Sequence, residues 1–174
     1  PFYWAIAFVF VFMIGGFSGL VLGSLATDIH VHDTAFVVAH FHYIVFGGTG
    51  FAFFGALHYW FPKMFARVYN FKVANTGLII FFIGFNMLYF PMFYLGLLGM
   101  PRRYYDYLPM FHSANILSTV GSWIMATGLL IIIINLIRAR KGSGKEIDDP
   151  WDGKTLEWTI PSPPIVENFE QIPE

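Results

Sequence analysis

The chain has 174 residues, of which 56% are hydrophobic, 20% aromatic and 12% charged, with a formal net charge of -1. An average soluble domain has roughly 25% charged residues, so this composition indicates a membrane protein, and the lack of a clustered basic footprint argues against a nucleic-acid partner. There is no cysteine, which excludes disulfides, iron–sulfur centres and thiolate metal sites within the chain and leaves histidine as its strong transition-metal ligand.

Four segments contain no Asp, Glu, Lys or Arg and are long enough to cross about 30 Å of hydrocarbon at about 1.5 Å per residue. One such segment could be a buried core helix, but four in succession leave too little polar sequence for a soluble surface. We therefore expect an all-α membrane protein with four transmembrane helices in residues 1–141. The predicted helices cover residues 2–27, 34–62, 73–100 and 107–137.

The last part of the chain, residues 142–174, changes to Gly, Ser, Pro and acidic residues, which predicts an extended soluble tail. At the other end the sequence opens with Pro1, and a hydrophobic run begins at once without a charged leader region. We expect this chain to be a fragment of a longer polypeptide.

Positively charged residues are distributed unevenly among the connections, which predicts orientation by the positive-inside rule. The connection after the second helix and the segment after the fourth are expected on the cytoplasmic side or its equivalent, together with the tail. Alternation then puts Arg102 and Arg103 on the outer side, against the rule, so we expect these two to serve another purpose. The basic residues on which the orientation depends are Lys63, Arg67, Lys72, Arg138, Arg140, Lys141 and Lys145.

The first connection, on the predicted outer side, offers adjacent nitrogen and oxygen ligands. His32 with Asp33 could bind magnesium or manganese if a neighbouring chain and water complete the shell. Two ligands are too few for a closed site, and Asp33 suits the N-cap of the next helix equally well. The two roles are compatible.

The second predicted helix contains Ala39-His40-Phe41-His42-Tyr43. Each residue of an α-helix turns the chain by about 100°, so His40 and His42 face opposite directions and cannot chelate one metal. They lie roughly 10 Å below the outer end, where an ionisable side chain is by default a functional hypothesis. Neutral histidines bonded to neighbouring helices are one interpretation. Axial ligands to two hemes, with Phe41 between them, explain the spacing better.

Hemes carry propionates, and hemes near the outer end would direct them toward that surface. Arg102 and Arg103 suit such carboxylates because the guanidinium fork pairs them bidentately. Simple solvation of these arginines is the alternative. His58 precedes Tyr59-Trp60-Phe61-Pro62, which predicts an interfacial aromatic belt, so we expect His58 to be a membrane-interface residue and not a ligand.

These motifs resemble subunit I of heme–copper cytochrome oxidases over essentially the whole chain. The matching runs are His32-Asp33-Thr34, Val37-Val38-Ala39-His40-Phe41-His42-Tyr43, Trp60-Phe61-Pro62, Leu95-Gly96-Leu97-Leu98-Gly99-Met100-Pro101-Arg102-Arg103-Tyr104, Leu156-Glu157-Trp158 and Ser162-Pro163-Pro164. The resemblance implies the last four helices of a twelve-helix bundle in a bacterial or mitochondrial inner membrane, with the tail on the cytoplasmic or matrix side.

The resemblance also implies roles for individual residues. His40 would bind the high-spin heme iron, where oxygen reacts, and His42 the low-spin heme iron, with Phe41 between the hemes. Arg102, Arg103 and Asp28 would contact propionates, and His32 with Asp33 would match a magnesium site shared with subunit II. The implied cofactors are two hemes of A type, magnesium, and copper ligated by residues outside this chain.

The activity implied by the resemblance is proton-pumping reduction of oxygen to water. The copper ligands and the second low-spin heme ligand belong to earlier helices, so the partners would be the remainder of subunit I and subunits II and III. Asp33 and Tyr43 favour cytochrome c as donor, whereas Tyr59-Trp60-Phe61-Pro62-Lys63 and His112 look closer to the quinol oxidases. A diheme electron carrier without oxygen chemistry and a heme-free bundle are the competing interpretations.

Overall fold

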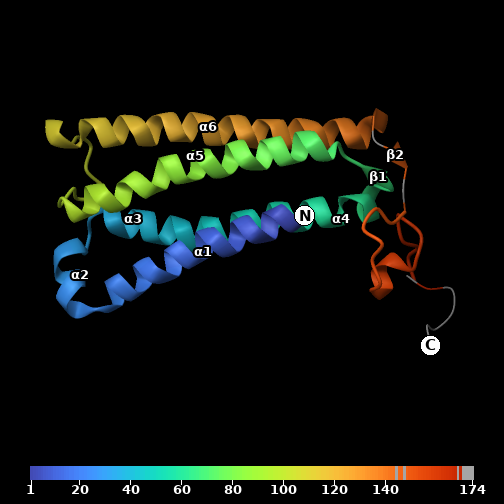
Figure 1. The fold of residues 1–174 in the computed structure, drawn as a ribbon, viewed down its shortest axis with the longest axis horizontal. Coiled ribbons are helices and arrows are strands. Elements are labelled where there is room, and N and C mark those ends of the chain that lie inside the picture. Colours follow the sequence, from blue (N-terminus) through green and yellow to red (C-terminus); the bar gives the residue numbers. More distant parts are fainter. Residues whose placement is uncertain (144, 147, 168, 170–174) are drawn as a thin grey trace.

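The computed structural model describes residues 1–143, 145–146, 148–167 and 169. Within this part of the chain, four helical spans are long and apolar enough to cross a membrane: Phe2–Gly23, Ala35–Phe65, Phe71–Leu97 and Pro109–Gly142. They lie lengthwise beside one another (Figure 1). The prediction of an all-α membrane protein with four transmembrane helices is confirmed.

The first span is α1 (Phe2–Gly23), which ends four residues earlier than predicted. Ser24 adopts an extended backbone, and a separate short helix, α2 (Leu25–Val31), follows where the sequence had predicted the helix end and a loop. The Ser24 carbonyl accepts the backbone N–H of Asp28 at 2.8 Å, and the Thr27 hydroxyl also donates to it at 2.9 Å. α2 therefore places Asp28 on a helical turn at the end of the bundle.

The second span is built from three helical segments. α3 (Ala35–Phe41) is capped by Thr34, whose hydroxyl accepts a hydrogen bond from the Phe36 backbone N–H at 3.2 Å. The chain then adopts π-helical geometry in η1 (His42–Gly50) and returns to an α-helix in α4 (Phe51–Phe65). The sequence predicted one continuous helix, so the π segment is a new feature.

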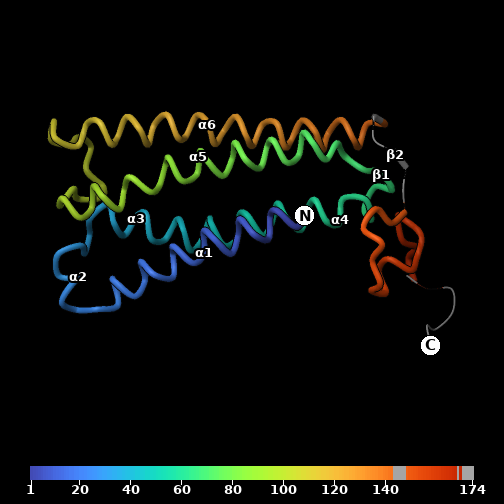
Figure 2. The backbone as a smooth tube through the Cα atoms, viewed as in Figure 1, coloured from blue at the N-terminus to red at the C-terminus, as the bar shows by residue number. Residues whose placement is uncertain are grey.

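The third and fourth spans, α5 (Phe71–Leu97) and α6 (His112–Arg138), pack closely along their length. A Cβ at Gly84 would overlap the backbone of Met125, and a Cβ at Gly121 would overlap the backbone of Leu88. Small residues allow this close approach of helices in a membrane. Figure 2 shows α5 beside α6, and α1 beside the rod formed by α3, η1 and α4.

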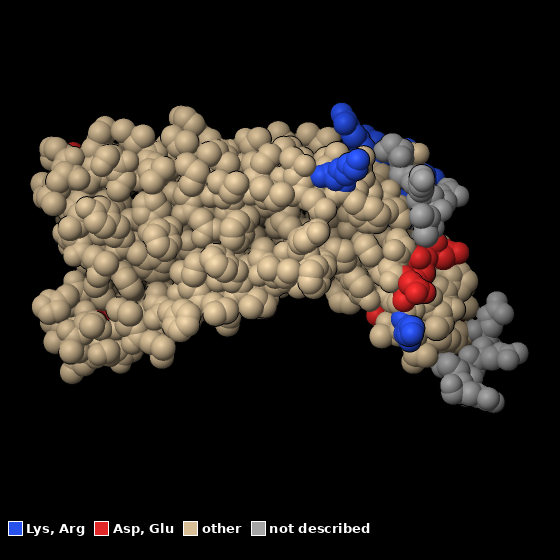
Figure 3. Space-filling view, viewed as in Figure 1, with Lys and Arg blue, Asp and Glu red and all other residues tan. Residues whose placement is uncertain are grey.

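The tail folds back on the end of the bundle where α4 and α6 finish. β1 (Arg67–Val68) pairs antiparallel with β2 (Lys145–Glu146), so the turn after α4 holds the segment after α6. The short elements η3 (Ala139–Ser143) and η4 (Leu156–Trp158) complete this region, and η2 (Pro109–Phe111) precedes α6 at the other end. The charged side chains visible in Figure 3 gather at the tail end, whereas the surface over the spans is almost uncharged.

Candidate functional site

The two histidines of the second span face different helices. His40 lies near the end of α3, and its Nδ1 is 2.9 Å from the Ser18 Oγ and 3.1 Å from the Gly15 carbonyl oxygen, both on α1. His42 is the first residue of η1, and its ring stacks on Tyr89 of α5 with centroids 4.1 Å apart and planes 17° apart. Each imidazole is therefore held by its own neighbour.

Carbonyl contacts determine the tautomer of both imidazoles. A carbonyl oxygen only accepts hydrogen bonds, so the Nδ1 of His40 near Gly15 carries a proton. The same holds for the Nδ1 of His42, which lies 2.8 Å from the Val38 carbonyl oxygen. In neutral imidazoles the Nε2 atoms then keep their lone pairs, as in metal-bound histidines whose other nitrogen is hydrogen-bonded. Both side chains fit axial ligation of a heme iron.

Residues of α1 define the space around the His40 ring. The buried Ser18 hydroxyl donates to the Gly15 carbonyl at 2.8 Å, so its oxygen can accept from the His40 Nδ1–H. A Cβ at Gly19 would lie 3.1 Å from the His40 Cε1, closer than ordinary contact. Sequence reasoning did not assign Ser18 or Gly19 to the site. The signal available was that Gly15 and Gly19 are four residues apart with Ser18 between them, a pattern of small residues that is typical of close helix packing in membranes.

The π segment begins at His42 itself. The backbone N–H of His42 is shared between the carbonyls of Val38 and Ala39, where α geometry gives way to π geometry. The next side chain, Tyr43, is fully buried and donates to the Asn86 Oδ1 on α5 at 2.8 Å. π-helical turns are frequent at functional sites, and this one begins at one of the two predicted ligands.

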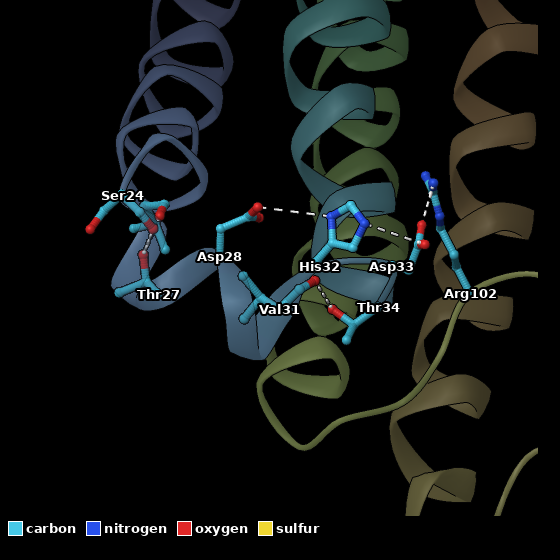
Figure 4. Close-up of polar contacts among 9 residues, drawn as sticks. Ser24, Thr27, Asp28, Val31, His32, Asp33, Thr34 and Arg102 are labelled. Atoms are coloured by element: carbon cyan, nitrogen blue, oxygen red, sulfur yellow. Dashed lines mark hydrogen bonds and ion pairs between the residues drawn. The ribbon is translucent and has the colours of Figure 1, made fainter.

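Four of the predicted polar site residues lie together at the opposite end from the tail (Figure 4). The His32 Nδ1 is 3.8 Å from the Asp28 Oδ2, and its Nε2 is 3.5 Å from the Asp33 Oδ2. The other oxygen of Asp33 pairs with the Arg102 Nη2 at 2.5 Å. The Arg102 backbone N–H also donates to the Asp33 carbonyl at 3.0 Å, so the loop after α5 is fixed to the start of α3.

The remaining candidates differ in burial. The Arg102 Nε is buried and has no hydrogen-bond partner among the described residues, so it could donate to an added anion. Arg103 is exposed on a left-handed backbone with φ of 67°. Phe41 is 39% exposed, with its ring centroid 4.5 Å from that of His42. The structure brings Arg102 into contact with Asp33, whereas Arg103 and Phe41 are exposed.

A divalent-metal site is incomplete in the described part of the chain, which contains no group of three or more His, Cys, Asp or Glu residues placed to hold an ion. The His32 Nε2 and Asp33 Oδ2 are 3.5 Å apart. This separation allows both atoms to bind one ion at about 2.0–2.2 Å each. The pair therefore fits two positions of a shell whose other ligands lie elsewhere.

His58 is packed inside the bundle near the tail end of the second span. This side chain is 1% exposed, and it lies between Trp4, with ring centroids 5.3 Å apart, and Tyr69, with ring centroids 4.8 Å apart. Its Nδ1 is 2.6 Å from the Phe54 carbonyl oxygen. Burial also raises the pKa of the Tyr69 phenol above its ordinary value. Trp4 of α1 and Tyr69 of the turn after α4 therefore cover this histidine, and its assignment to the membrane interface stays a prediction.

Comparisons with known proteins agree with the fold and with the site motifs. The family model described as "Cytochrome C and Quinol oxidase polypeptide I" matches residues 1–124. A solved structure, described as a heme-copper terminal oxidase dimer studied by cryo-EM, superposes with a TM-score of 0.72 at 28% identity, covering 80% of this chain and 26% of that chain.

Similar curated proteins include both donor types. Cytochrome c oxidase subunit 1 of Bacillus sp. strain PS3 is 44% identical over 99% of this chain and 29% of its own length. The Synechocystis protein of the same name is 45% identical over 97% of this chain and 31% of its own length. Quinol oxidase subunit 1 of Bacillus subtilis strain 168 is 42% identical over 100% of this chain and 28% of its own length. The chain thus spans about three tenths of the length of these relatives. With a family model matched over most of its residues, this chain belongs to the cytochrome c and quinol oxidase polypeptide I family.

Proposed function

We propose that this chain supplies one axial ligand to each of two hemes in subunit I of a proton-pumping terminal oxidase that reduces oxygen to water. One observation carries the proposal. Each imidazole has its Nδ1 held against a backbone carbonyl, at 3.1 Å for His40 and 2.8 Å for His42, which leaves each Nε2 as a ligand. The two rings contact different helices, so they serve two separate irons.

In this proposal His40 would hold the iron of the high-spin heme, the heme at which oxygen reacts, and His42 would hold the iron of the low-spin heme. The hemes, of A type, supply electron transfer and oxygen binding, and copper is held by residues outside this chain. Phe41 lies between the two ligands in sequence and separates the hemes. Hydrogen bonds to Nδ1 orient both rings and raise the basicity of both Nε2 atoms.

Anionic propionates are assigned to the polar end of the site. The buried Arg102 Nε needs an acceptor, and Arg103 adds a second positive charge beside it. Asp28 is the third residue assigned here, near the propionate of the high-spin heme. His32 and the free oxygen of Asp33 provide two ligands for magnesium or manganese, while the other Asp33 oxygen holds Arg102.

Cytochrome c is the proposed electron donor, because Asp33 and Tyr43 are the residues that favour it. Relatives of both donor types have similar identity to this chain, 44% for a cytochrome c oxidase and 42% for a quinol oxidase. The purified oxidase should oxidise reduced cytochrome c at a rate that is many times its rate with a short-chain quinol. The reverse preference would assign the chain to the quinol branch.

The tail is proposed to face the cytoplasm or mitochondrial matrix. The chain has no cysteine, so Lys154→Cys, on an exposed tail residue, introduces a single labelling site. A membrane-impermeant maleimide should label this site only in inverted vesicles. Labelling only in right-side-out vesicles would reverse the orientation. In the same proposal, the partners of this chain are the rest of subunit I and subunits II and III.

Heme spectra of the assembled oxidase test the ligand assignment. His42→Ala should abolish the low-spin heme signal and spare the high-spin heme, and His40→Ala should do the converse. His30→Ala is the matched control, because this histidine lies on α2 and is exposed. Equal loss of both signals in both ligand variants, with the control intact, would contradict the assignment of faces.

Carbon monoxide distinguishes the oxidase from a diheme electron carrier. An iron whose one protein ligand is His40 leaves a position for carbon monoxide, so the reduced oxidase should show a shifted heme spectrum. Two closed irons would give no shift and would favour the carrier. Absence of heme from the assembled complex, measured as the pyridine hemochrome, would support a heme-free bundle.

A further inference from the structure

The stacking of Tyr89 on His42 connects α5 to the proposed low-spin ligand. The two rings are nearly parallel, with centroids 4.1 Å apart and planes 17° apart. Tyr89 is half-buried and is itself held by Phe85, whose ring centroid lies 5.0 Å away at 59°. The phenol therefore belongs to the packed interior and offers a fixed surface to one face of the imidazole.

Two contacts together define the plane of the His42 ring. The bond from Nδ1 to the Val38 carbonyl, at 2.8 Å, fixes one atom of the ring but still permits rocking about it. A parallel aromatic surface on one face resists that rocking, because tilting the ring would open a gap or cause a clash. One turn earlier on α5, Asn86 accepts the bond from the buried Tyr43, which anchors the same helix to the start of η1.

We propose that Tyr89 is a positioning residue that sets the plane and the electron density of the His42 imidazole, and through it the redox potential of the low-spin heme. This inference rests on the proposed function, in which His42 Nε2 ligates that iron. Ferric iron makes its imidazole ligand more positive than ferrous iron does. The negative face of a neighbouring aromatic ring stabilises that positive charge. Tyr89 thus favours the ferric state.

Substitutions at Tyr89 in the assembled oxidase test the proposal by two readouts that do not depend on turnover. Tyr89→Leu removes the aromatic face and should raise the midpoint potential of the low-spin heme. It should also shift the g-values of the ferric low-spin signal in electron paramagnetic resonance, which report the orientation of axial imidazole planes. Tyr89→Phe keeps the ring and should restore both values to those of the wild type.

Tyr94→Leu is the matched control, since Tyr94 lies on the same helix, is 59% exposed and makes no ring contact with His42. Unchanged potential and g-values in an assembled Tyr89→Leu oxidase would overturn the proposal, as would equal shifts in the control. If Tyr89→Leu does not assemble, Tyr89→Met, whose flexible side chain fills the same space, is judged by the same two values. Retention of the low-spin signal in His42→Ala would instead refute the ligand assignment itself, whatever the Tyr89 variants show.

Discussion

Gly19 determines how closely α1 approaches the His40 ring. A Cβ at this position would lie 3.1 Å from the ring carbon Cε1, so Gly19→Ala must push the imidazole by a few tenths of an ångström. Displacements of about 1 Å at a reacting centre can cost on the order of a hundredfold in rate. We therefore expect Gly19→Ala to reduce oxygen consumption several-fold and to alter the carbon monoxide difference spectrum.

Gly16→Ala is the control for this experiment, because a Cβ at Gly16 has no atom of the described chain within 4 Å. Both substitutions change the helix propensity of α1 equally, so they differ chiefly in contact with the His40 ring. If both variants changed oxygen consumption equally, the effect would come from a general change in the packing of α1 and not from displacement of the His40 ring.

Arg102 is the second residue whose role can be tested directly. Arg102 has two separate groups of donors: Nη2 pairs with Asp33, and the buried Nε is available to a propionate. A lysine keeps the positive charge but has a single ammonium group, which cannot occupy both positions. A propionate that is less well compensated stabilises the ferric iron, so Arg102→Lys should lower heme midpoint potentials, measured by redox titration. Arg103→Lys should lower them less, since Arg103 is exposed. Unchanged potentials in an assembled Arg102→Lys oxidase would count against a propionate contact.

At the residue scale, the sequence predicted that His40 and His42 face different partners, because helical geometry alone determines that direction. It did not predict Ser18 or Tyr89, which approach the imidazoles from other helices. Nor did it predict that the hydroxyls of Thr119 and Thr127 donate to carbonyls of their own helix, at 2.9 and 2.8 Å. Such choices depend on neighbours that sequence spacing does not reveal.

At the element scale, the change from α to π geometry at His42 could not be predicted from the sequence, because η1 is as apolar as an ordinary transmembrane helix. The break after α1 was hidden for a similar reason, since no charge or proline marks Ser24. The four spans themselves could be predicted because length and hydropathy suffice for them. Local helix geometry depends on packing, and therefore needs the structure.

Lys63 is one attachment of the tail to α4, and it is 6% exposed although it is charged. Its Nζ donates to the carbonyls of Ile160 at 2.7 Å and Pro161 at 3.3 Å and to the Ser162 Oγ at 3.1 Å. It also lies 5.4 Å from the centre of the Trp158 ring. A single side chain thus satisfies three acceptors of the tail.

Lys63→Met should release the tail while leaving the four spans folded. The substitution keeps an apolar side chain but removes the donor of three hydrogen bonds, and hydrogen bonds to a charged group are worth about 1.5–3 kcal/mol each. Proteinase K should therefore cleave the tail faster in this variant, as followed by mass spectrometry. Lys72→Met is the control, because Lys72 is exposed at the start of α5. Equal cleavage of wild type and Lys63→Met would show that other contacts, such as Trp158 Nε1 to the Tyr59 hydroxyl at 2.7 Å, hold the tail.

At the scale of the whole molecule, the four spans leave most of their surface open. Between 22% and 39% of the residues in the most apolar window of each span are buried within the described chain. Exposed apolar side chains can pack against lipid tails or against further helices, because both are apolar surroundings. The site is open in the same sense, because the chain offers one imidazole nitrogen to each proposed iron.

This openness predicts the behaviour of the chain by itself. A low-spin heme iron needs two axial protein ligands, and the chain spans about three tenths of its relatives, so we expect the purified chain to reduce no oxygen and to form no low-spin heme signal. Co-expression with the preceding helices of the subunit as a separate polypeptide should restore the low-spin spectrum. The same co-expression with His42→Ala should not, although both polypeptides still associate. Oxygen reduction by the chain alone, measured with an oxygen electrode after free heme is removed, would contradict the proposal that each heme site is shared with helices outside it.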